Sequence, residues 1–262
     1  GYLPLVTSKK FRINGYHIPP YTPYFGPVIY EKDVLKKSEI IEELIKPFKK
    51  AGHIDFVIRP GDADIVNYTR LGFTVEGSQT HIIDHKKGYS LNNIHGSKRR
   101  YVKKLKELEN NGKFNILKGK EAVDALIKLN IETEERAGFR GNRDVLKLLL
   151  ENFATEETAF VICTVDNLPL AGAFCPADEH YAYHVINASS RHKDSLLDKT
   201  NLLSAYKMAE NAVLKGKSFD FEGSNIPGVA AFYRMMGGVP EFNYRMMKSR
   251  SLLMYMLFFE LI

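Results

Sequence analysis

Apolar residues recur at helical spacing in two segments that lie far apart in the chain. They are Ile40, Ile41, Leu44, Ile45 and Phe48, which precede Gly52, and Leu202, Leu203, Tyr206, Ala209 and Val213, which precede Gly216. Spacings of three and four residues place such side chains on one stripe of an α-helix, and a glycine just beyond the stripe favours the helix end. The pattern predicts one helix before Gly52 and a long helix over 196–214.

Three strand patterns follow one another in the second half of the chain. They cover residues 159–165, 169–175 and 180–187. Asp166 and Asn167 separate the first two patterns, and residues 177–179 separate the last two, which is the composition of short hairpin turns. The pattern predicts an antiparallel meander, which the helix over 196–214 follows.

One stretch of sequence recurs with an offset of 165 residues. The matching residues are Asp55, Phe56, Tyr68 and Gly72 in the first copy and Asp220, Phe221, Tyr233 and Gly237 in the second. Each copy follows one of the helical patterns and precedes a short β-like run. The recurring unit of helix, strand, short helix ending in Tyr-x-x-x-Gly, and strand predicts two similar domains.

The composition describes a folded protein without disulfides or membrane spans. Of the 262 residues, 44% are hydrophobic and 26% are charged, which excludes a disordered chain. The two cysteines, Cys163 and Cys175, are expected to be reduced residues of a cytoplasmic protein, and the sequence has no run of about 20 apolar residues. The formal charge of +6 suits an anionic partner such as a phosphate, CoA or RNA.

The order of elements in the second half resembles the GNAT N-acetyltransferase fold. The matching features are the meander, the long helix after it and an apolar-Tyr-x-x-x-Gly signature. Two segments resemble this signature, Phe232-Tyr233-Arg234-Met235-Met236-Gly237 and, in the first copy, Asn67-Tyr68-Thr69-Arg70-Leu71-Gly72, which has asparagine at the apolar position. The resemblance implies a mixed α+β fold of two tandem GNAT-like domains, each a mostly antiparallel sheet flanked by helices.

Tandem GNAT domains in one chain resemble the FemABX family, the peptidoglycan-bridge aminoacyltransferases. Further matches are the segments 219–223 and 226–229, Gly237-Gly238, and the loop over 18–26. The resemblance covers most of the chain. It predicts an N-terminal domain over 1–90, a basic linker helix over 91–112 and a C-terminal domain over 113–262. The first domain starts inside a strand pattern and is expected to lack its first elements.

The resemblance implies an acyl donor and leaves acetyl-CoA, another acyl-CoA and aminoacyl-tRNA open, the last being the donor of Fem-type enzymes. GNAT enzymes that use acetyl-CoA carry a glycine-rich loop whose backbone N–H groups bind pyrophosphate. The equivalent segment here, 189–195, has no glycine. The positive end of the helix dipole and nearby cationic side chains both favour binding of a phosphate group. We therefore expect this loop, which precedes the helix over 196–214, to bind the phosphates of the donor. The donor-binding residues would be Arg191, His192, Lys193 and Ser195.

A carboxylate at the end of the strand pattern over 218–222 is the first catalytic candidate. Alternation along a strand places Asp220 and Glu222 on one face. Asp220 recurs as Asp55, whereas Glu222 corresponds to Val57, so its charge is present in the second copy only. A residue needed only for folding is expected in both copies. Glu222 is therefore predicted to be a general base, and a solvated strand end is the alternative.

Tyr233 and Arg234 are the other catalytic candidates. A tyrosine at this position of GNAT enzymes can protonate the departing thiolate, and the resemblance implies this role for Tyr233, although some Fem-type sequences have lysine here. Tyr68 occupies the same place in the first copy, so packing is the alternative. Arg234 corresponds to Thr69, and a fixed cation there could stabilise an oxyanion or hold a phosphate.

The densest run of positive charge lies over 98–106. Lys98, Arg99 and Arg100 are expected to contact an anion or RNA, and a solvated helix face is the alternative.

Together these features predict an acyltransferase that moves an acyl or aminoacyl group onto an amine of a small molecule or a peptidoglycan precursor. Two other classes stay open, a non-catalytic binding protein that has kept the fold and an RNA-binding module that uses the basic helix. No redox cofactor is implied, and no metal is expected because the sequence shows no metal-ligand spacing.

Overall fold

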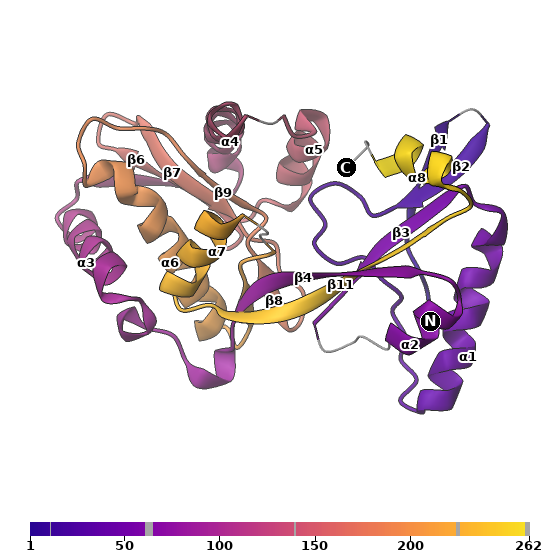
Figure 1. Cartoon of the computed structure of the whole chain (residues 1–262). Helices are drawn as coiled ribbons and strands as arrows, with labels where there is room; N and C mark the ends of the chain where they lie inside the picture. Colours follow the sequence, from indigo (N-terminus) through magenta and orange to yellow (C-terminus); the bar gives the residue numbers. More distant parts are fainter. Residues whose placement is uncertain (11, 61–64, 139, 224–225, 260–262) are drawn as a thin grey trace. The chain divides into compact units, whose positions relative to one another are not determined.

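The computed structural model describes the whole chain except residues 11, 61–64, 139, 224–225 and 260–262 (Figure 1). The chain forms two compact units. Unit 1 comprises Gly1–Gln79 and Glu241–Ile262, and unit 2 comprises Thr80–Pro240. These boundaries differ from those expected from the sequence, because the basic segment 91–112 lies inside unit 2 and the end of the chain belongs to unit 1.

Unit 1 is built on a mostly antiparallel sheet with the strand order β1-β2-β3-β11-β4. The strands are β1 (Val6–Lys10), β2 (Ile13–His17), β3 (His53–Ile58), β11 (Val239–Ser249) and β4 (Thr74–Ile83). β2 pairs with β3 in parallel, whereas β1–β2 and β3–β11 are antiparallel. The last residues of β4 and the first of β11 belong to unit 2.

Alternation along β3 divides its side chains between the two faces of the unit 1 sheet. Ile54, Phe56 and Ile58 pack in the unit 1 core with residues of α1 (Val34–Ile45), η1 (Lys46–Lys50) and α2 (Ile65–Arg70). His53 and Asp55 lie on the other face, and α8 (Leu252–Phe259) packs against β3. The polar pair is therefore separated from the apolar core of its own unit.

Unit 2 contains an antiparallel sheet with the strand order β5-β6-β7-β9. These strands are β5 (Phe114–Lys118), β6 (Ala159–Thr164), β7 (Pro169–Phe174) and β9 (Ile186–Ser189). In the same unit the end of β4 pairs antiparallel with β10 (Ser218–Asp220), which pairs in parallel with β8 (Tyr181–Tyr183). The predicted meander is present, but its third strand is divided at residues 184–185. The division arises because β8 pairs with β10, whereas β9 pairs with β7.

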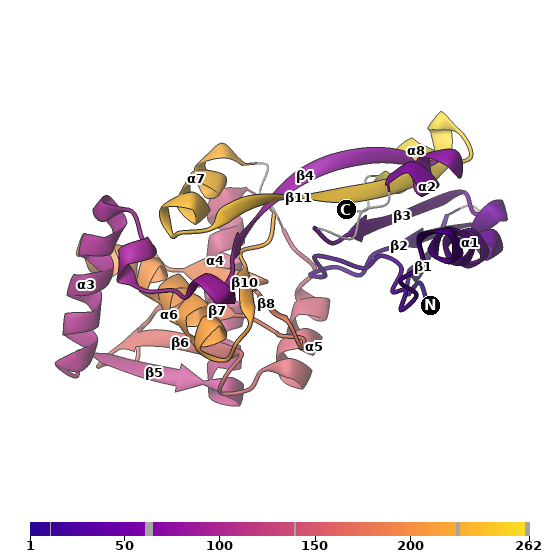
Figure 2. The same cartoon turned by 90° about the horizontal axis from the view of Figure 1, so that it is seen from below.

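Helices cover both faces of the four-stranded sheet. The helices of unit 2 are α3 (Gly96–Asn110), α4 (Val123–Ala137), α5 (Arg143–Phe153), α6 (Thr200–Leu214) and α7 (Pro227–Met235), with the short turns η2 (His85–Lys87), η3 (Leu91–Asn93), η4 (Gly119–Ala122) and η5 (Leu197–Lys199). α6 packs on β7 and β9 with α3 against it, and Figure 1 shows α4 and α5 on the other side of this sheet (see also Figure 2). The predicted mixed α+β fold class is confirmed.

The two copies of the recurring segment have the same local topology. β3 pairs in parallel with β2 and antiparallel with β11, while β10 pairs in parallel with β8 and antiparallel with β4. Each copy continues into a short helix, and a glycine with positive φ follows, Gly72 at 80° and Gly237 at 95°. Residues with a side chain rarely adopt a positive φ, which explains why glycine occupies both positions. That the two copies superpose stays a prediction.

Within the described residues, every helix is too short or too polar to cross a lipid bilayer.

Candidate active site

The loop that precedes α6 binds its own backbone through two carboxylates. Asp194 Oδ1 accepts hydrogen bonds from the N–H groups of Leu196 (2.7 Å) and Leu197 (3.1 Å). Asp198 Oδ1 accepts a hydrogen bond from the N–H group of His192 at 3.3 Å, and His192 Nδ1 accepts one from the N–H group of Asp194 at 3.0 Å. These backbone donors, which the comparison with GNAT loops would assign to a pyrophosphate, are satisfied within the protein.

Both carboxylates carry negative charge at neutral pH. The N–H groups of Leu197 and Leu196 lower the pKa of Asp194 below its usual value. Burial opposes ionisation of Asp198, but hydrogen bonds from Lys199 and from the backbone of His192 outweigh it and lower its pKa. Two fixed negative charges at the start of the helix repel a pyrophosphate bound to this loop.

A pocket of about 320 Å³ lies beside the loop. We call it the cationic pocket, because its lining includes four cationic side chains from α3, α4, the loop and η5: Lys98, Arg136, Arg191 and Lys199. The other lining residues are Ser189, Asp198, Asn201, Leu202 and Phe232. One carboxylate among four cations leaves an excess of positive charge, and Asp198 is paired with both Lys199 Nζ at 2.9 Å and Arg191 at 3.5 Å. The pocket therefore suits an anionic group.

The cationic pocket brings together Arg191, which was predicted to bind the donor, and Lys98, which was predicted to contact an anion or RNA. The other predicted donor residues, His192, Lys193 and Ser195, do not line it. His192 is used instead to order the loop. The cationic pocket thus gathers a different set of cations from the one that the sequence indicated for the donor.

Two further basic residues of α3 have structural contacts. The guanidinium group of Arg99 donates hydrogen bonds to the carbonyl oxygens of Ile94 (2.9 and 3.1 Å) and Asn92 (3.1 Å), which anchors the start of α3. The guanidinium of Arg100 lies 5.7 Å from the ring centroid of Tyr101. Neither residue lines the cationic pocket.

Sequence reasoning missed Arg136, Lys199 and Asn201. Arg136 lies in the last turn of α4, and Lys199 and Asn201 lie where η5 meets α6. Arg136 belongs to a different element from Lys199 and Asn201, so no spacing in the sequence marks it as their neighbour.

A second polar group, the carboxylate cluster, surrounds the end of β10. It consists of Asp220, Glu222, Thr80 and Tyr233. Asp220 is almost fully buried, and its Oδ1 accepts hydrogen bonds from Thr80 Oγ1 and from the N–H group of Glu222 (2.8 Å). Asp220 thereby fixes the backbone at Glu222.

The strand ends at Asp220, so Glu222 is not placed by strand alternation as predicted. Its φ is 60°, a left-handed conformation that is rare outside glycine and costs of order 1 kcal/mol or more. Glu222 Oε1 is buried and has no hydrogen-bond partner among the described residues. Burial and the neighbouring charge of Asp220 raise the pKa of Glu222 well above its usual value. Backbone strain and a perturbed carboxyl group at one residue are typical of functional sites.

Tyr233 joins the carboxylate cluster from α7. Its ring stacks on Phe221 with centroids 4.8 Å apart and lies 5.7 Å from the ring of His81. Burial and the charges of Glu222 and Asp220 raise the pKa of Tyr233, so its hydroxyl is protonated and can donate a proton. Arg234, the third predicted catalytic residue, is exposed, and its charge adds to burial in lowering the pKa of His81.

Gly238 sets how closely α7 approaches β4. A Cβ atom at this position would lie 2.9 Å from the Cβ of His81 and 3.1 Å from the ring of Phe221. Such contacts are shorter than packed side chains tolerate. The glycine that follows the Tyr-x-x-x-Gly signature therefore holds Tyr233 near the end of β10.

The strand break in the meander carries a buried histidine. His184 contacts the rings of Phe219 and Phe221, at centroid distances of 5.3 and 5.7 Å, and its ring nitrogens have no hydrogen-bond partner among the described residues. Burial lowers the pKa of His184 to about 3, so the ring is neutral.

Cys175 has a raised pKa because of burial and the charge of Glu222.

The raised pKa of Glu222 predicts a pH-dependent stability for Glu222→Gln. A carboxyl group whose pKa is higher in the folded state stabilises the fold below its unfolded pKa, and this contribution is lost as pH rises through the folded pKa. Glutamine stays neutral, so the variant and the wild type should have similar melting temperatures at pH 5. At pH 9 the variant should melt at least about 2–4 °C higher, as determined by calorimetry. A constant difference between pH 5 and 9 would contradict a buried Glu222 carboxyl group.

Solved structures share this fold. FemX has a TM-score of 0.66 and 16% sequence identity, covering 97% of this chain and 86% of its own. The C-terminal domain of a protein assigned as a lysylphosphatidylglycerol synthetase from Agrobacterium fabrum has a TM-score of 0.63 and 12% identity, covering 97% and 83%. L-PGS from Bacillus licheniformis has a TM-score of 0.59 and 12% identity, covering 97% and 84%.

These structures show the fold, and the expected likeness to FemABX-type proteins is confirmed at that level. No family model and no curated protein sequence matches the chain.

Proposed function

We propose that the protein is an acyltransferase that moves an acyl or aminoacyl group onto an amine, with the donor in the cationic pocket. The observation that carries this proposal is the placement of α7. Its Phe232 lines the cationic pocket, and the next residue, Tyr233, belongs to the carboxylate cluster. An anion site and an acid–base group thus adjoin the same turn of one helix, on a fold shared with FemX.

In this arrangement the acceptor amine attacks the donor carbonyl directly, and two side chains transfer the protons. The amine nitrogen forms a bond to the donor carbonyl carbon, and the bond from that carbon to the donor oxygen or sulfur breaks. Glu222 takes the proton that the amine loses, and its raised pKa makes it a stronger base than an ordinary carboxylate once it is ionised. The hydroxyl of Tyr233 donates a proton to the leaving group. The protein otherwise contributes positioning.

Aminoacyl-tRNA fits the cationic pocket better than acyl-CoA does. Four backbone N–H groups of the loop before α6 are already bonded within the protein, and Asp194 and Asp198 oppose the charge of a pyrophosphate. Side-chain cations from four separate segments suit phosphodiester groups, which carry one charge each. The resemblance to FemABX-type enzymes supports the same donor and an amine acceptor on a peptidoglycan precursor or a small molecule.

Donor binding and transfer test the proposal together. Filter binding should show that aminoacyl-tRNA binds and that its affinity falls by about 20- to 50-fold between 50 and 200 mM salt, because three or four phosphate contacts give a slope near −2 to −3. Acetyl-CoA should bind weakly. With hydroxylamine as a small acceptor, the bound aminoacyl group should appear as the hydroxamate.

Transfer from acetyl-CoA at a higher rate would overturn the choice of donor. The absence of transfer from both donors, in protein shown to bind one of them, would overturn the assignment as an acyltransferase.

A further inference from the structure

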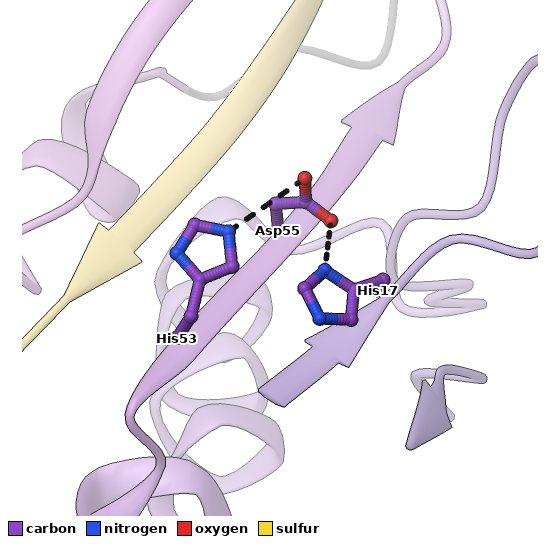
Figure 3. A group of neighbouring side chains, drawn as sticks. All are labelled: His17, His53 and Asp55. Atoms are coloured by element: carbon purple, nitrogen blue, oxygen red, sulfur yellow. Dashed lines mark ion pairs between the residues drawn. The ribbon is translucent and has the colours of Figure 1, made fainter. Parts of the chain in front are cut away.

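Three buried polar side chains of unit 1 converge on one point, on the sheet face opposite the apolar core. They are His17 at the end of β2, and His53 and Asp55 on β3 (Figure 3). The exposed fractions of these residues are 6%, 0% and 0%. Figure 3 shows the carboxylate of Asp55 between the two imidazole rings.

Three atoms of this group have no hydrogen-bond partner, although His53 Nε2 lies 3.8 Å from Asp55 Oδ2, within ion-pair distance. They are His17 Nδ1, His53 Nε2 and Asp55 Oδ1, each buried and without a hydrogen bond among the described residues. His17 Nδ1 lies 3.5 Å from Asp55 Oδ1, which is longer than a hydrogen bond. A buried polar atom without a partner is unfavourable by about 1–3 kcal/mol, and three that point at one place indicate a missing ligand.

The opposite nitrogen of each ring is held by a hydroxyl group. His17 Nε2 lies 2.8 Å from Ser8 Oγ, and His53 Nδ1 lies 2.6 Å from Ser249 Oγ. Metal-binding histidines show this pattern, because a hydrogen bond at one nitrogen fixes the ring and directs the lone pair of the other toward the ion. Both rings are therefore oriented as outer hydrogen bonds orient metal ligands.

We propose that His17, His53 and Asp55 bind a divalent first-row transition metal ion of the zinc class. Two ligand atoms that each lie about 2.0–2.2 Å from a tetrahedral ion are separated by about 3.3–3.5 Å. The 3.5 Å between His17 Nδ1 and Asp55 Oδ1 matches this separation, and the ligand atoms of all three residues lie within 4.8 Å of one another. Two imidazoles and one carboxylate form a ligand set for zinc, cobalt or nickel rather than for magnesium or calcium.

The carboxylate of Asp55 offers one oxygen to an ion. Arg245 pairs with the second carboxylate oxygen, Oδ2, and leaves Oδ1 for the ion. The arginine charge disfavours a second cation, so we expect an affinity below that of a site with no adjacent arginine.

α8 covers the metal site. The ring of Phe258 lies 5.6 Å from that of His17 and 5.9 Å from that of His53, measured between centroids. Gly15 makes room for this cover, since a Cβ atom there would lie 2.5 Å from the Phe258 ring. An ion enclosed by β2, β3 and α8 would have a structural role, joining these elements within unit 1.

Cobalt binding to the full-length protein tests the proposal. After treatment with a chelator and its removal, Co²⁺ should bind with one-to-one stoichiometry and produce visible absorption bands of a low-coordinate site. Zn²⁺ should displace it and raise the melting temperature. His17→Gln should weaken binding by more than about 100-fold, since loss of an outer hydrogen bond alone weakens metal binding about 10- to 100-fold.

Two further variants keep the test decisive if His17→Gln does not fold. Ser8→Ala removes only the hydroxyl beside His17 Nε2 and should weaken Co²⁺ binding about 10- to 100-fold. His180→Ala removes an exposed histidine of unit 2 and should leave binding unchanged. The absence of stoichiometric Co²⁺ binding by the wild type, or equal affinities of the wild type and Ser8→Ala, would overturn the proposal.

Discussion

Glu222→Gln is expected to lower turnover by about 100- to 10,000-fold and to leave donor affinity unchanged. Glutamine keeps the shape and most hydrogen-bonding capacity of the side chain but cannot accept a proton from the attacking amine. The side chain belongs to the carboxylate cluster and does not line the cationic pocket, so the donor should bind as before. Single-turnover transfer to hydroxylamine and filter binding measure the two quantities separately.

The pH profile distinguishes a base from a structural carboxylate. The wild type should lose activity as pH falls, through a pKa well above the ordinary glutamate value, because burial and Asp220 hold the proton on Glu222. The loss of activity at low pH should be absent from the pH profile of Glu222→Gln. Glu179→Gln, at an exposed residue of unit 2, is the matched control and should behave as the wild type. Near-normal turnover of Glu222→Gln would remove Glu222 from the mechanism.

Replacing Lys98, Arg136 and Arg191 together by glutamine is expected to weaken donor binding by about 100-fold at 50 mM salt. Each replacement removes one charge-assisted contact to phosphate, at about 1 kcal/mol for a solvent-accessible pair, and the three contacts combine to about 3 kcal/mol. Donor binding should also become less sensitive to salt, with the slope of log K against log salt concentration smaller in magnitude by about 2. Filter binding with aminoacyl-tRNA between 50 and 200 mM salt measures both effects.

A second triple variant controls for net charge. Lys103, Lys104 and Lys193 are exposed and lie outside the lining of the cationic pocket, although Lys193 was among the donor-binding residues predicted from sequence. Their replacement by glutamine removes the same charge and should weaken binding by less than about threefold. Equal losses in both triple variants would show that RNA binds through the general basic surface and not through the pocket.

Much of the fold could be predicted because its signals are local. Apolar spacing marked the helix that became α6, and turn residues marked the meander of β6, β7, β8 and β9. The recurring Tyr-x-x-x-Gly segment identified α2 and α7 together with the positive-φ glycines after them. These features depend on near neighbours in the chain, so a single sequence contains them.

The candidate site could be predicted only in part. Glu222 stood out because a carboxylate replaces valine in one of two related segments, a comparison that the sequence alone permits. Its strained backbone and raised pKa were not foreseeable, because they come from Asp220, Thr80 and the burial of the β10 end. The hydrogen bonds that occupy the backbone N–H groups of the loop before α6 were not foreseeable either, because they depend on the directions of the Asp194 and Asp198 side chains.

The sequence by itself determined the helix that became α6, the region of the meander and the residue types that can do chemistry, since periodicity and turn composition act over a few residues. Only the tertiary structure decided which of these residues meet. Lys98, Arg136 and Arg191 come from α3, α4 and the loop before α6, and they share one pocket because α3 packs on α6 while α4 and α6 both pack on β7 and β9. His17 reaches His53 and Asp55 because β2 pairs in parallel with β3 across a long intervening segment. Such contacts follow from strand register and helix packing, which join distant parts of the chain and leave no fixed spacing in the sequence.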